Sequence, residues 1–223
     1  MASASSASYN GLRVHSMRRA AREAIETIAL AALVFLFFQS TVANFEVQGR
    51  SMVPNLQDRE RVLVNKLVYM AIEQNSLNTY LPWMGDVGDE PWFPFHAPER
   101  GEIIVFRLTA DPTQNFVKRV IGLPGDVVEL SDTELYINGE LLDEPYERIE
   151  IHEPANRSIT VEDGTYFVLG DNRLQSEDSR SRRVGLVPEE NIIGKVWVEY
   201  WPLSSINVLT SPLGWASAFP LAR

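Results

Sequence analysis

One serine and one lysine stand out as side chains that could carry out nucleophilic catalysis. Ser51 lies in the segment Gly49-Arg50-Ser51-Met52-Val53-Pro54, and a serine hydroxyl needs a base to accept its proton. The 223-residue chain contains no cysteine, and its three histidines are far apart in sequence with no sign of a catalytic triad. The candidate base that remains is Lys118. Taken singly, a Ser-x-x-Pro segment is usually a turn, and a lone strand lysine is usually a solvated edge residue.

Lys118 lies in the run Asn115–Ile121, whose alternation predicts that its side chain shares a strand face with Phe116 and Val120. Apolar surroundings disfavour the ammonium form, so the lysine pKa would fall from its reference value of about 10.4. A fall to about 8 corresponds to roughly 3 kcal/mol, which full burial can supply. A neutral lysine can then act as the base, since Ser–Lys pairs are a known variant of the Ser–His–Asp arrangement.

A third segment, Gly170–Arg180, is dense in small polar and charged residues, with the sequence GDNRLQSEDSR. A loop of this composition could hydrogen-bond a buried amine and orient it. The same composition also suits an ordinary surface turn that follows a strand.

Composition limits the other classes of function. The chain has 20 Lys and Arg against 30 Asp and Glu, a formal net charge of −10, which argues against nucleic acid as a partner. No histidine belongs to an H-x-x-x-H pair, and without cysteine a metal site is not expected. We therefore expect no metal and no cofactor.

A membrane segment is expected near the N-terminus. Residues 28–38 are eleven consecutive apolar residues, and a helix over 23–43 would span about 30 Å, the thickness of a bilayer core. Arg18, Arg19 and Arg22 precede it, so residues 1–22, expected to be disordered, would be cytoplasmic and residues 44–223 extracytoplasmic. A cleavable signal peptide ending at Thr41-Val42-Ala43, a buried core helix and an organellar transit sequence remain as alternatives.

The remainder, residues 44–223, is predicted to be mainly β. Short β-branched runs separated by Gly, Pro, Asn and Asp favour a coiled antiparallel sheet or a barrel-like body. Asn138-Gly139 indicates a hairpin with a type I′ turn inside a small extension, 129–163. The aromatic insertion 70–99, with Trp83 and Trp92, is either an irregular loop or a patch that touches lipid headgroups. The expected strands cover 44–48, 61–65, 102–107, 115–121, 127–130, 134–137, 165–169 and 195–201.

Together these segments resemble bacterial-type signal peptidase I, a membrane-bound Ser–Lys endopeptidase of the S26 peptidase family. Each motif is weak alone, but the anchor and the motifs follow one another in family order over roughly residues 24–203. The resembling motifs are Ser51–Pro54, Arg100–Phe106, Lys118–Asp126, Gly170–Arg173 with Ser176, Asp178, Ser179 and Arg180, and Tyr200–Leu203.

The resemblance implies a role for each of these side chains. Ser51 would be the nucleophile and Lys118 the general base, with Ser176 hydrogen-bonded to the lysine amine. Asp178 and Arg180 would form a supporting ion pair, and Arg119 would pair with Asp171. The pocket walls nominated by motif position are Val47, Met52, Leu56, Phe116 and Val117.

Two positions depart from the family pattern. Some members have a serine that donates to the oxyanion where this chain has Gly49, so the oxyanion hole would depend mainly on the backbone N–H of Ser51. Asn55 replaces a frequent threonine and is expected to be a surface change.

The implied substrates are secretory preproteins with small residues at positions −1 and −3, cleaved at the cell membrane, with a thylakoid membrane not excluded. A self-cleaving repressor-like Ser–Lys peptidase would need a DNA-binding domain in place of the anchor. A membrane-anchored β-rich binding module, or a degenerate peptidase without catalysis, is the alternative from another class.

Overall fold

The computed structural model describes residues 5–70, 95–132, 134–144 and 153–209. The chain divides after Thr41 into two compact units, an N-terminal helix and a β-rich body. Most of the aromatic insertion, including Trp83 and Trp92, lies outside the described residues, as does the tail after residue 209. The lipid-contact hypothesis for these segments therefore stays a prediction.

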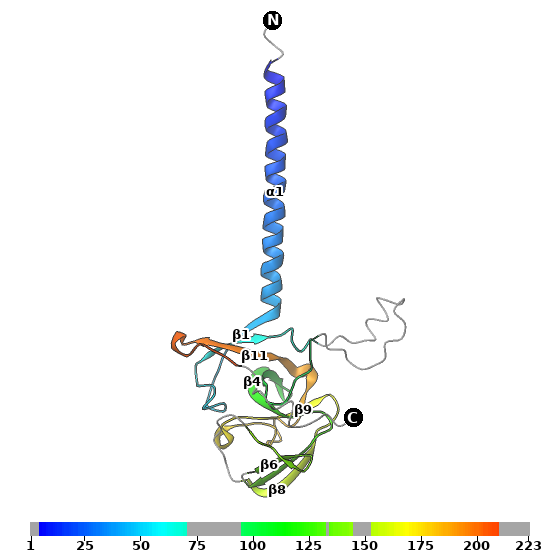
Figure 1. Ribbon diagram of the computed structural model, residues 1–223, viewed down its shortest axis with the longest axis vertical. Helices are drawn as coiled ribbons and strands as arrows, with labels where there is room; N and C mark the ends of the chain where they lie inside the picture. Colours follow the sequence, from blue (N-terminus) through cyan, green and yellow to red (C-terminus); the bar gives the residue numbers. More distant parts are fainter. Residues whose placement is uncertain (1–4, 71–94, 133, 145–152, 210–223) are drawn as a thin grey trace, which may run out of the picture. The chain divides into compact units, whose positions relative to one another are not determined.

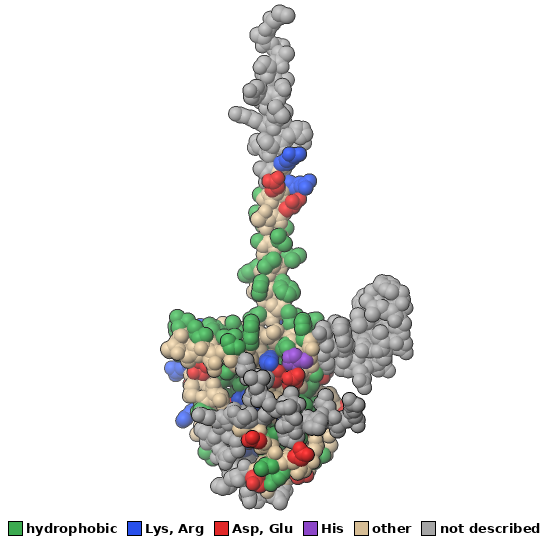
Figure 2. Space-filling view, viewed as in Figure 1, with side chains coloured by type: hydrophobic (Ala, Val, Ile, Leu, Met, Phe, Trp, Pro, Cys, Tyr) green, Lys and Arg blue, Asp and Glu red, His purple; other side chains and the backbone are tan. Residues whose placement is uncertain are grey.

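The first unit is a single helix, α1 (Ser5–Thr41). Its part Arg22–Thr41 has a mean hydropathy of 1.7 and is long and apolar enough to cross a membrane. Leu30, Leu33 and Phe35 on this part are exposed, and Figure 2 shows hydrophobic side chains along the helix beyond a charged group of side chains. Exposed apolar side chains of this size are stable in a hydrocarbon environment.

The bounds of this helix correct two expectations. Residues 5–22 are helical instead of disordered, because alanine, arginine and methionine are good helix formers and simply extend the anchor helix. The helix ends at Thr41, two residues before the expected end at 43. Val42 and Ala43 already belong to the first strand.

The second unit contains a large antiparallel sheet with the strand order β1-β2-β11-β3-β4-β9-β10, and β12 pairs with β11 (Figure 1). The antiparallel β class expected from the sequence is confirmed. Its strands are β1 (Val42–Glu46), β2 (Arg61–Asn65), β3 (Ile103–Leu108), β4 (Asp111–Gly122), β9 (Thr165–Leu169), β10 (Val187–Pro188), β11 (Ile192–Trp201) and β12 (Asn207–Val208).

Strand β4 changes its pairing partner along its length. Its first part pairs with β3, with Lys118 opposite Ile104. From Arg119 onward it also pairs with β9, with Arg119 opposite Leu169. Lys118 is therefore the last residue of β4 before the second neighbour begins, at the point where one edge of the strand is still open.

A second sheet has the order β7-β6-β5-β8 and lies at the end of the body away from β1 and β11 (Figure 1). It consists of β5 (Val127–Asp132), β6 (Glu134–Ile137), β7 (Glu140–Leu141) and β8 (Glu153–Thr160). Asn138 and Gly139 have φ angles of 55° and 81°, as the predicted type I′ turn requires. The extension is thus a four-stranded sheet and larger than the expected hairpin, because the polar strand β8 has no hydrophobic pattern that would announce it.

Within the described part of the body, three apolar clusters form the core. One joins the small sheet to β4 and β9, where a side chain at Gly122 would collide with Val128 and Phe167. A second packs β3, β4 and β9 together around Phe106 and Tyr166. The third cluster lies beneath the segment that carries Ser51, and its buried members are Val47, Met52, Leu56, Val62, Val64, Ile103, Val105 and Val196.

Three short 3-10 helices complete the described structure of the body: η2 (Arg173–Gln175), η3 (Glu189–Asn191) and η4 (Leu203–Ser205).

Candidate active site

Ser51 lies on a loop, residues 47–60, that leaves β1 and returns to β2. The loop is closed at its base by two backbone hydrogen bonds of 2.8 Å, from the N–H of Val47 to the carbonyl of Glu60 and from the N–H of Arg59 to the carbonyl of Val47. Met52 and Leu56 are fully buried beneath it and belong to the third core cluster. The loop is therefore held by the core, which gives Ser51 a rigid support.

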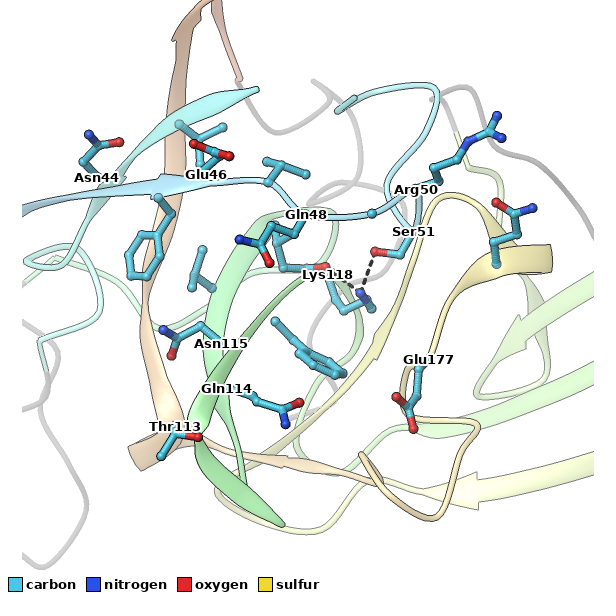
Figure 3. Close-up of a pocket in the computed structure, with 18 residues that line it drawn as sticks. Asn44, Glu46, Gln48, Arg50, Ser51, Thr113, Gln114, Asn115, Lys118 and Glu177 are labelled. Carbon is cyan, nitrogen blue, oxygen red and sulfur yellow. Dashed lines mark hydrogen bonds between the residues drawn. The ribbon is translucent and has the colours of Figure 1, made fainter. Parts of the chain in front are cut away.

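The hydroxyl of Ser51 and the amine of Lys118 are in direct contact. Oγ of Ser51 lies 2.8 Å from Nζ of Lys118, and Nζ also donates to the carbonyl of Val117 at 2.8 Å (Figure 3). The Phe116 ring centroid is 5.3 Å from the same nitrogen. The contact brings together two elements that are 67 residues apart in sequence.

Burial controls the charge of this amine. Lys118 is 4% exposed, and loss of hydration lowers its pKa from 10.5 to about 8. The carboxylates of Asp178, Asp171 and Glu177 oppose this shift, but desolvation is the larger effect. A substantial fraction of the amine is therefore neutral near pH 8, which is the state a general base needs.

Two buried ion pairs support the loop next to the amine. Arg119 donates to both carboxylate oxygens of Asp171, at 2.8 and 2.7 Å. Arg180 donates to both oxygens of Asp178, at 2.8 and 3.0 Å, and Asp178 also accepts from the N–H of Gly170. Both pairs occur between the residues that the resemblance named.

The replacement of threonine by Asn55 is not the surface change that was expected from the sequence. Its side-chain amide donates to Asp171 at 2.8 Å, so it joins the loop 47–60 to the buried ion pair of Asp171 with Arg119. A polar residue in a turn gives no local signal of such a contact, since its partner is 116 residues away.

The hydrogen bond expected from Ser176 to the lysine amine is not formed in this structure. The Ser176 hydroxyl oxygen is buried and has no hydrogen-bond partner among the residues that the structure describes. It lies against Gly170, where a Cβ atom would collide with the Ser176 side chain and with the carbonyl oxygen of Ser51. The polar contacts of the amine go instead to Ser51 and to the Val117 carbonyl.

The sequence did not predict Asn172 as a site residue, although it makes two hydrogen bonds to the segment Arg50-Ser51. Its backbone N–H donates to the carbonyl of Ser51 at 3.0 Å, and its side-chain amide donates to the carbonyl of Arg50 at 3.0 Å. The Gly-Asp-Asn sequence indicated only a turn, so the residue could be placed in the site only by the tertiary contact.

The backbone N–H groups of Gly49 and Ser51, both near the expected oxyanion hole, differ in whether they already donate a hydrogen bond. The N–H of Gly49 donates to the side chain of Asp58 at 2.7 Å and is thereby occupied. Across the part of the chain that the structure describes, the N–H of Ser51 donates no hydrogen bond. No described protein acceptor therefore occupies this N–H.

A groove of about 720 Å³ passes over the Ser51–Lys118 contact (Figure 3). One wall is the segment 44–51, and the facing wall is 113–118 of β4; Val62, Val105, Gln175 and Glu177 complete the lining. Among described residues, β1 pairs only with β2, and Asn115–Val117 pair only with β3. The groove therefore lies between two strand edges whose backbone groups can bind an extended peptide.

The nominated pocket residues fall into two groups. Val47, Phe116 and Val117 line the groove. Met52 and Leu56 do not, because the turn after Ser51 directs both side chains into the core, with Leu56 N–H donating to the Met52 carbonyl at 2.9 Å. Val62 of β2 and Val105 of β3 line the groove in their place, and strand alternation alone could not show that these residues face a groove.

His96, Glu99 and Glu102 are the group of described residues whose side chains come close enough to hold a metal ion. Glu102 is buried, accepts a hydrogen bond from Tyr69 and forms an ion pair with Lys195. Its charge is therefore already compensated by protein groups. None of the three lines the groove.

Comparisons with known proteins agree on one family. The family model described as signal peptidase, peptidase S26, matches residues 21–201. The chain is 33% identical to signal peptidase IB of Staphylococcus aureus strain MRSA252, over 88% of this chain and 97% of that protein. It is 35% identical to signal peptidase I U of Bacillus subtilis strain 168, over 82% of this chain and 88% of that protein.

A solved structure is also similar in sequence. The crystal structure of a signal peptidase I from Enterococcus faecalis V583 is 38% identical, with a TM-score of 0.38, and the match covers 45% of this chain and 97% of that chain.

Proposed function

The chain belongs to the signal peptidase family, peptidase S26, and on this premise we propose that it is a membrane-anchored serine endopeptidase that uses Ser51 as nucleophile and Lys118 as general base. The observation that carries the proposal is the 2.8 Å contact between Ser51 Oγ and Lys118 Nζ in buried surroundings. As a signal peptidase I, the enzyme hydrolyses peptide bonds in preproteins that carry signal peptides.

The proposed reaction begins when Ser51 Oγ attacks the carbonyl carbon of the scissile bond and the hydroxyl proton passes to Lys118 Nζ. The tetrahedral intermediate collapses as the lysine ammonium gives that proton to the departing amine, which leaves Ser51 acylated. Water then attacks the ester, the amine accepts a proton from the water, and returns it to Ser51 as the signal peptide is released. One amine thus serves as base and as acid in both halves of the reaction.

The free N–H of Ser51 is the proposed oxyanion donor. A preorganised donor of this kind contributes roughly 3–4 kcal/mol to transition-state stabilisation in other hydrolases. Gly49 has no side-chain donor, and its N–H is held by Asp58. The orientation of the Ser51 N–H therefore matters more here than in an enzyme with a second donor.

The substrate is proposed to bind as an extended strand between the edges of β1 and β4. Val47, Phe116 and Val117 would close shallow apolar pockets, with Val62 and Val105 in the same lining. Such pockets favour small side chains at positions −1 and −3, because larger ones would have to displace residues that belong to the packed core.

Retention of α1 as a membrane anchor is proposed together with a cytoplasmic N-terminus and an extracytoplasmic body. The arginines before the apolar stretch favour this orientation. The pairing of Val42 with Asn65 and of Ala43 with Val64 supports retention of the anchor. Cleavage after Ala43 would remove the first two residues of β1, a strand that borders the groove.

The test is cleavage of a preprotein with alanine at −1 and −3 by the purified full-length protein in detergent. Ser51→Ala and Lys118→Ala are each expected to abolish cleavage, while Ser205→Ala and Lys66→Ala serve as matched controls and should retain it. A preprotein with phenylalanine at −1 should resist cleavage. Full activity in either dyad variant would exclude the proposed pair, and an inactive wild-type protein would favour the binding module or degenerate peptidase.

A further inference from the structure

We propose that Asn172 is a positioning residue that orients the oxyanion-binding N–H of Ser51, an inference that rests on the proposed function. Asn172 makes no contact with Lys118 among the hydrogen bonds of the described residues, and it does not line the groove. Its effect on the reaction would therefore pass through the backbone of the nucleophile segment.

The geometry of the peptide bond between Arg50 and Ser51 carries the first step. The bond is planar and trans, so the Arg50 carbonyl and the Ser51 N–H point in opposite directions from one rigid plane. The Asn172 side-chain amide donates to the Arg50 carbonyl at 3.0 Å. A group that holds this carbonyl consequently also sets the direction of the Ser51 N–H.

The next peptide plane is held by the same residue. The backbone N–H of Asn172 donates to the Ser51 carbonyl at 3.0 Å, so both planes that flank the Ser51 Cα are fixed by one neighbour. The Arg50 carbonyl also accepts from the N–H of Val53, and this hydrogen bond is longer, at 3.3 Å. Asn172 is thus the closer donor to this carbonyl.

Asn172 is itself firmly held. It is 2% exposed, and its side-chain oxygen accepts from the N–H of Gln175 at 3.2 Å, as the N-cap of η2. This contact decides which end of the amide faces Arg50, because the oxygen is engaged by Gln175 and the NH₂ group must point to the carbonyl. The preceding residue, Asp171, is fixed by its ion pair with Arg119.

An aspartate at position 172 would keep the N-cap of η2 but lose the hydrogen bond that positions the Arg50 carbonyl. Its carboxylate could still accept from Gln175, but it would place an oxygen against the Arg50 carbonyl where the amide now donates. The peptide plane would rotate to relieve this repulsion and turn the Ser51 N–H away from the oxyanion. Ser51 Oγ and Lys118 Nζ are not part of this plane.

The experiment compares Asn172→Asp, Asn172→Ala and the wild type as full-length proteins in detergent. Preprotein cleavage is measured on the alkaline plateau of each pH profile, so that a charge introduced near Lys118 does not affect the comparison. We expect kcat to fall by about 100-fold in Asn172→Asp and KM to stay within about twofold, since loss of an oxyanion donor acts on the transition state. Asn191→Ala, which removes a surface hydrogen bond to Thr109, is the matched control and should be unchanged.

A pair of inhibitors gives a readout that a general loss of structure would not reproduce. A peptide aldehyde ending in alanine can form a tetrahedral adduct with Ser51, whereas the corresponding peptide alcohol cannot. Aldehyde affinity should fall by about the same factor as kcat, and alcohol affinity should not change. Equal losses for both inhibitors, or an unchanged kcat, would overturn the proposal.

Two further measurements distinguish failure of the Asn172 role from misfolding of the variants and from failure of the proposed function. If both Asn172 variants fail to fold, a crystal structure of the wild-type aldehyde adduct decides, since an adduct oxygen that does not contact the Ser51 N–H would overturn the role. If the wild type does not cleave preproteins, or Ser51→Ala still does, the proposed function fails first. Active wild type with inactive Ser51→Ala leaves the Asn172 variants to test this inference alone.

Discussion

The ionisation of Lys118 leads to a quantitative prediction for the pH dependence of cleavage. A pKa of about 8 in place of 10.5 means that the surroundings, burial less the opposing carboxylates, disfavour the ammonium by roughly 3.5 kcal/mol, at about 1.4 kcal/mol per pKa unit. The base must be neutral to accept the Ser51 proton. Activity should therefore be lost as the pH falls through 8.

Single-turnover cleavage of a preprotein between pH 6 and pH 10 measures this ionisation directly, because product release does not contribute. With a pKa of about 8, roughly one enzyme in ten has a neutral amine at pH 7 and roughly nine in ten at pH 9. The rate should accordingly increase nearly tenfold between these two values and level off above pH 9.

Two variants should move the midpoint of this profile in opposite directions. Phe116→Ala removes a ring that lies 5.3 Å from the amine and admits water, so the Lys118 pKa and the midpoint should rise. Glu177→Gln removes a carboxylate that raises the Lys118 pKa, so the midpoint should fall. Glu134→Gln, on the small sheet, is the control and should leave the midpoint in place.

The reasoning is refuted if the wild-type midpoint lies near 10.5, or if the single-turnover rate does not depend on pH between 6 and 10. A shift of the same sign in Phe116→Ala and Glu177→Gln would also refute it, because desolvation and carboxylate charge act on the amine in opposite directions.

Three further predictions concern the supporting structure. Lys118→Met should be inactive but about 3 kcal/mol more stable than the wild type at pH 7, because a lysine with a lowered pKa destabilises the folded protein fully below pH 8 and this cost disappears as the pH rises from 8 through 10.5. Thermal unfolding of both proteins at pH 7 and above pH 10.5 measures the difference. Burial, together with the charge of Glu199, raises the pKa of Glu60, so the folded protein loses stability as the pH rises from the ordinary carboxyl pKa through the raised one. Glu60→Gln should therefore raise the unfolding temperature by a few degrees at pH 8 and by less at pH 4. In Gly170→Ala the new Cβ would collide with the Ser51 carbonyl, and the single-turnover rate should fall at least tenfold while the unfolding temperature changes by only a few degrees.

Short-range patterns predicted several elements of the body correctly. The strands β2, β6 and β9 have the bounds expected from their β-branched runs, and the Asn138-Gly139 turn has the expected positive φ angles. Each of these signals depends on a few neighbouring residues, whose backbone preferences are the same in any fold. A strand without such a pattern, β8, was missed because pairing with β5 forms it.

The residues of the candidate site had no comparable local signal. Elimination of the other candidate bases suggested Lys118 as the partner of Ser51, and the resemblance to a family supported the pair, but alternation along β4 says which face Lys118 occupies and not what lies opposite. Alternation placed Phe116 on that face, and its ring is indeed close to the amine. Met52 and Leu56 were expected in the pocket from their positions in the motif, but both are fully buried in the core. Motif position could not predict this, because a turn decides whether a side chain faces the groove or the core.

The amino-acid sequence alone determined the apolar helix, the antiparallel β class and the residue types available for chemistry, since these depend on composition and on contacts between near neighbours. Only the tertiary structure decided which hydroxyl meets which amine, that Asn172 holds both peptide planes around Ser51, and that the Ser176 hydroxyl has no hydrogen-bond partner within the described parts of the chain. The physical reason is that hydration and hydrogen bonding of a buried group are set by residues distant in the chain, and a low lysine pKa exists only where the folded body excludes water.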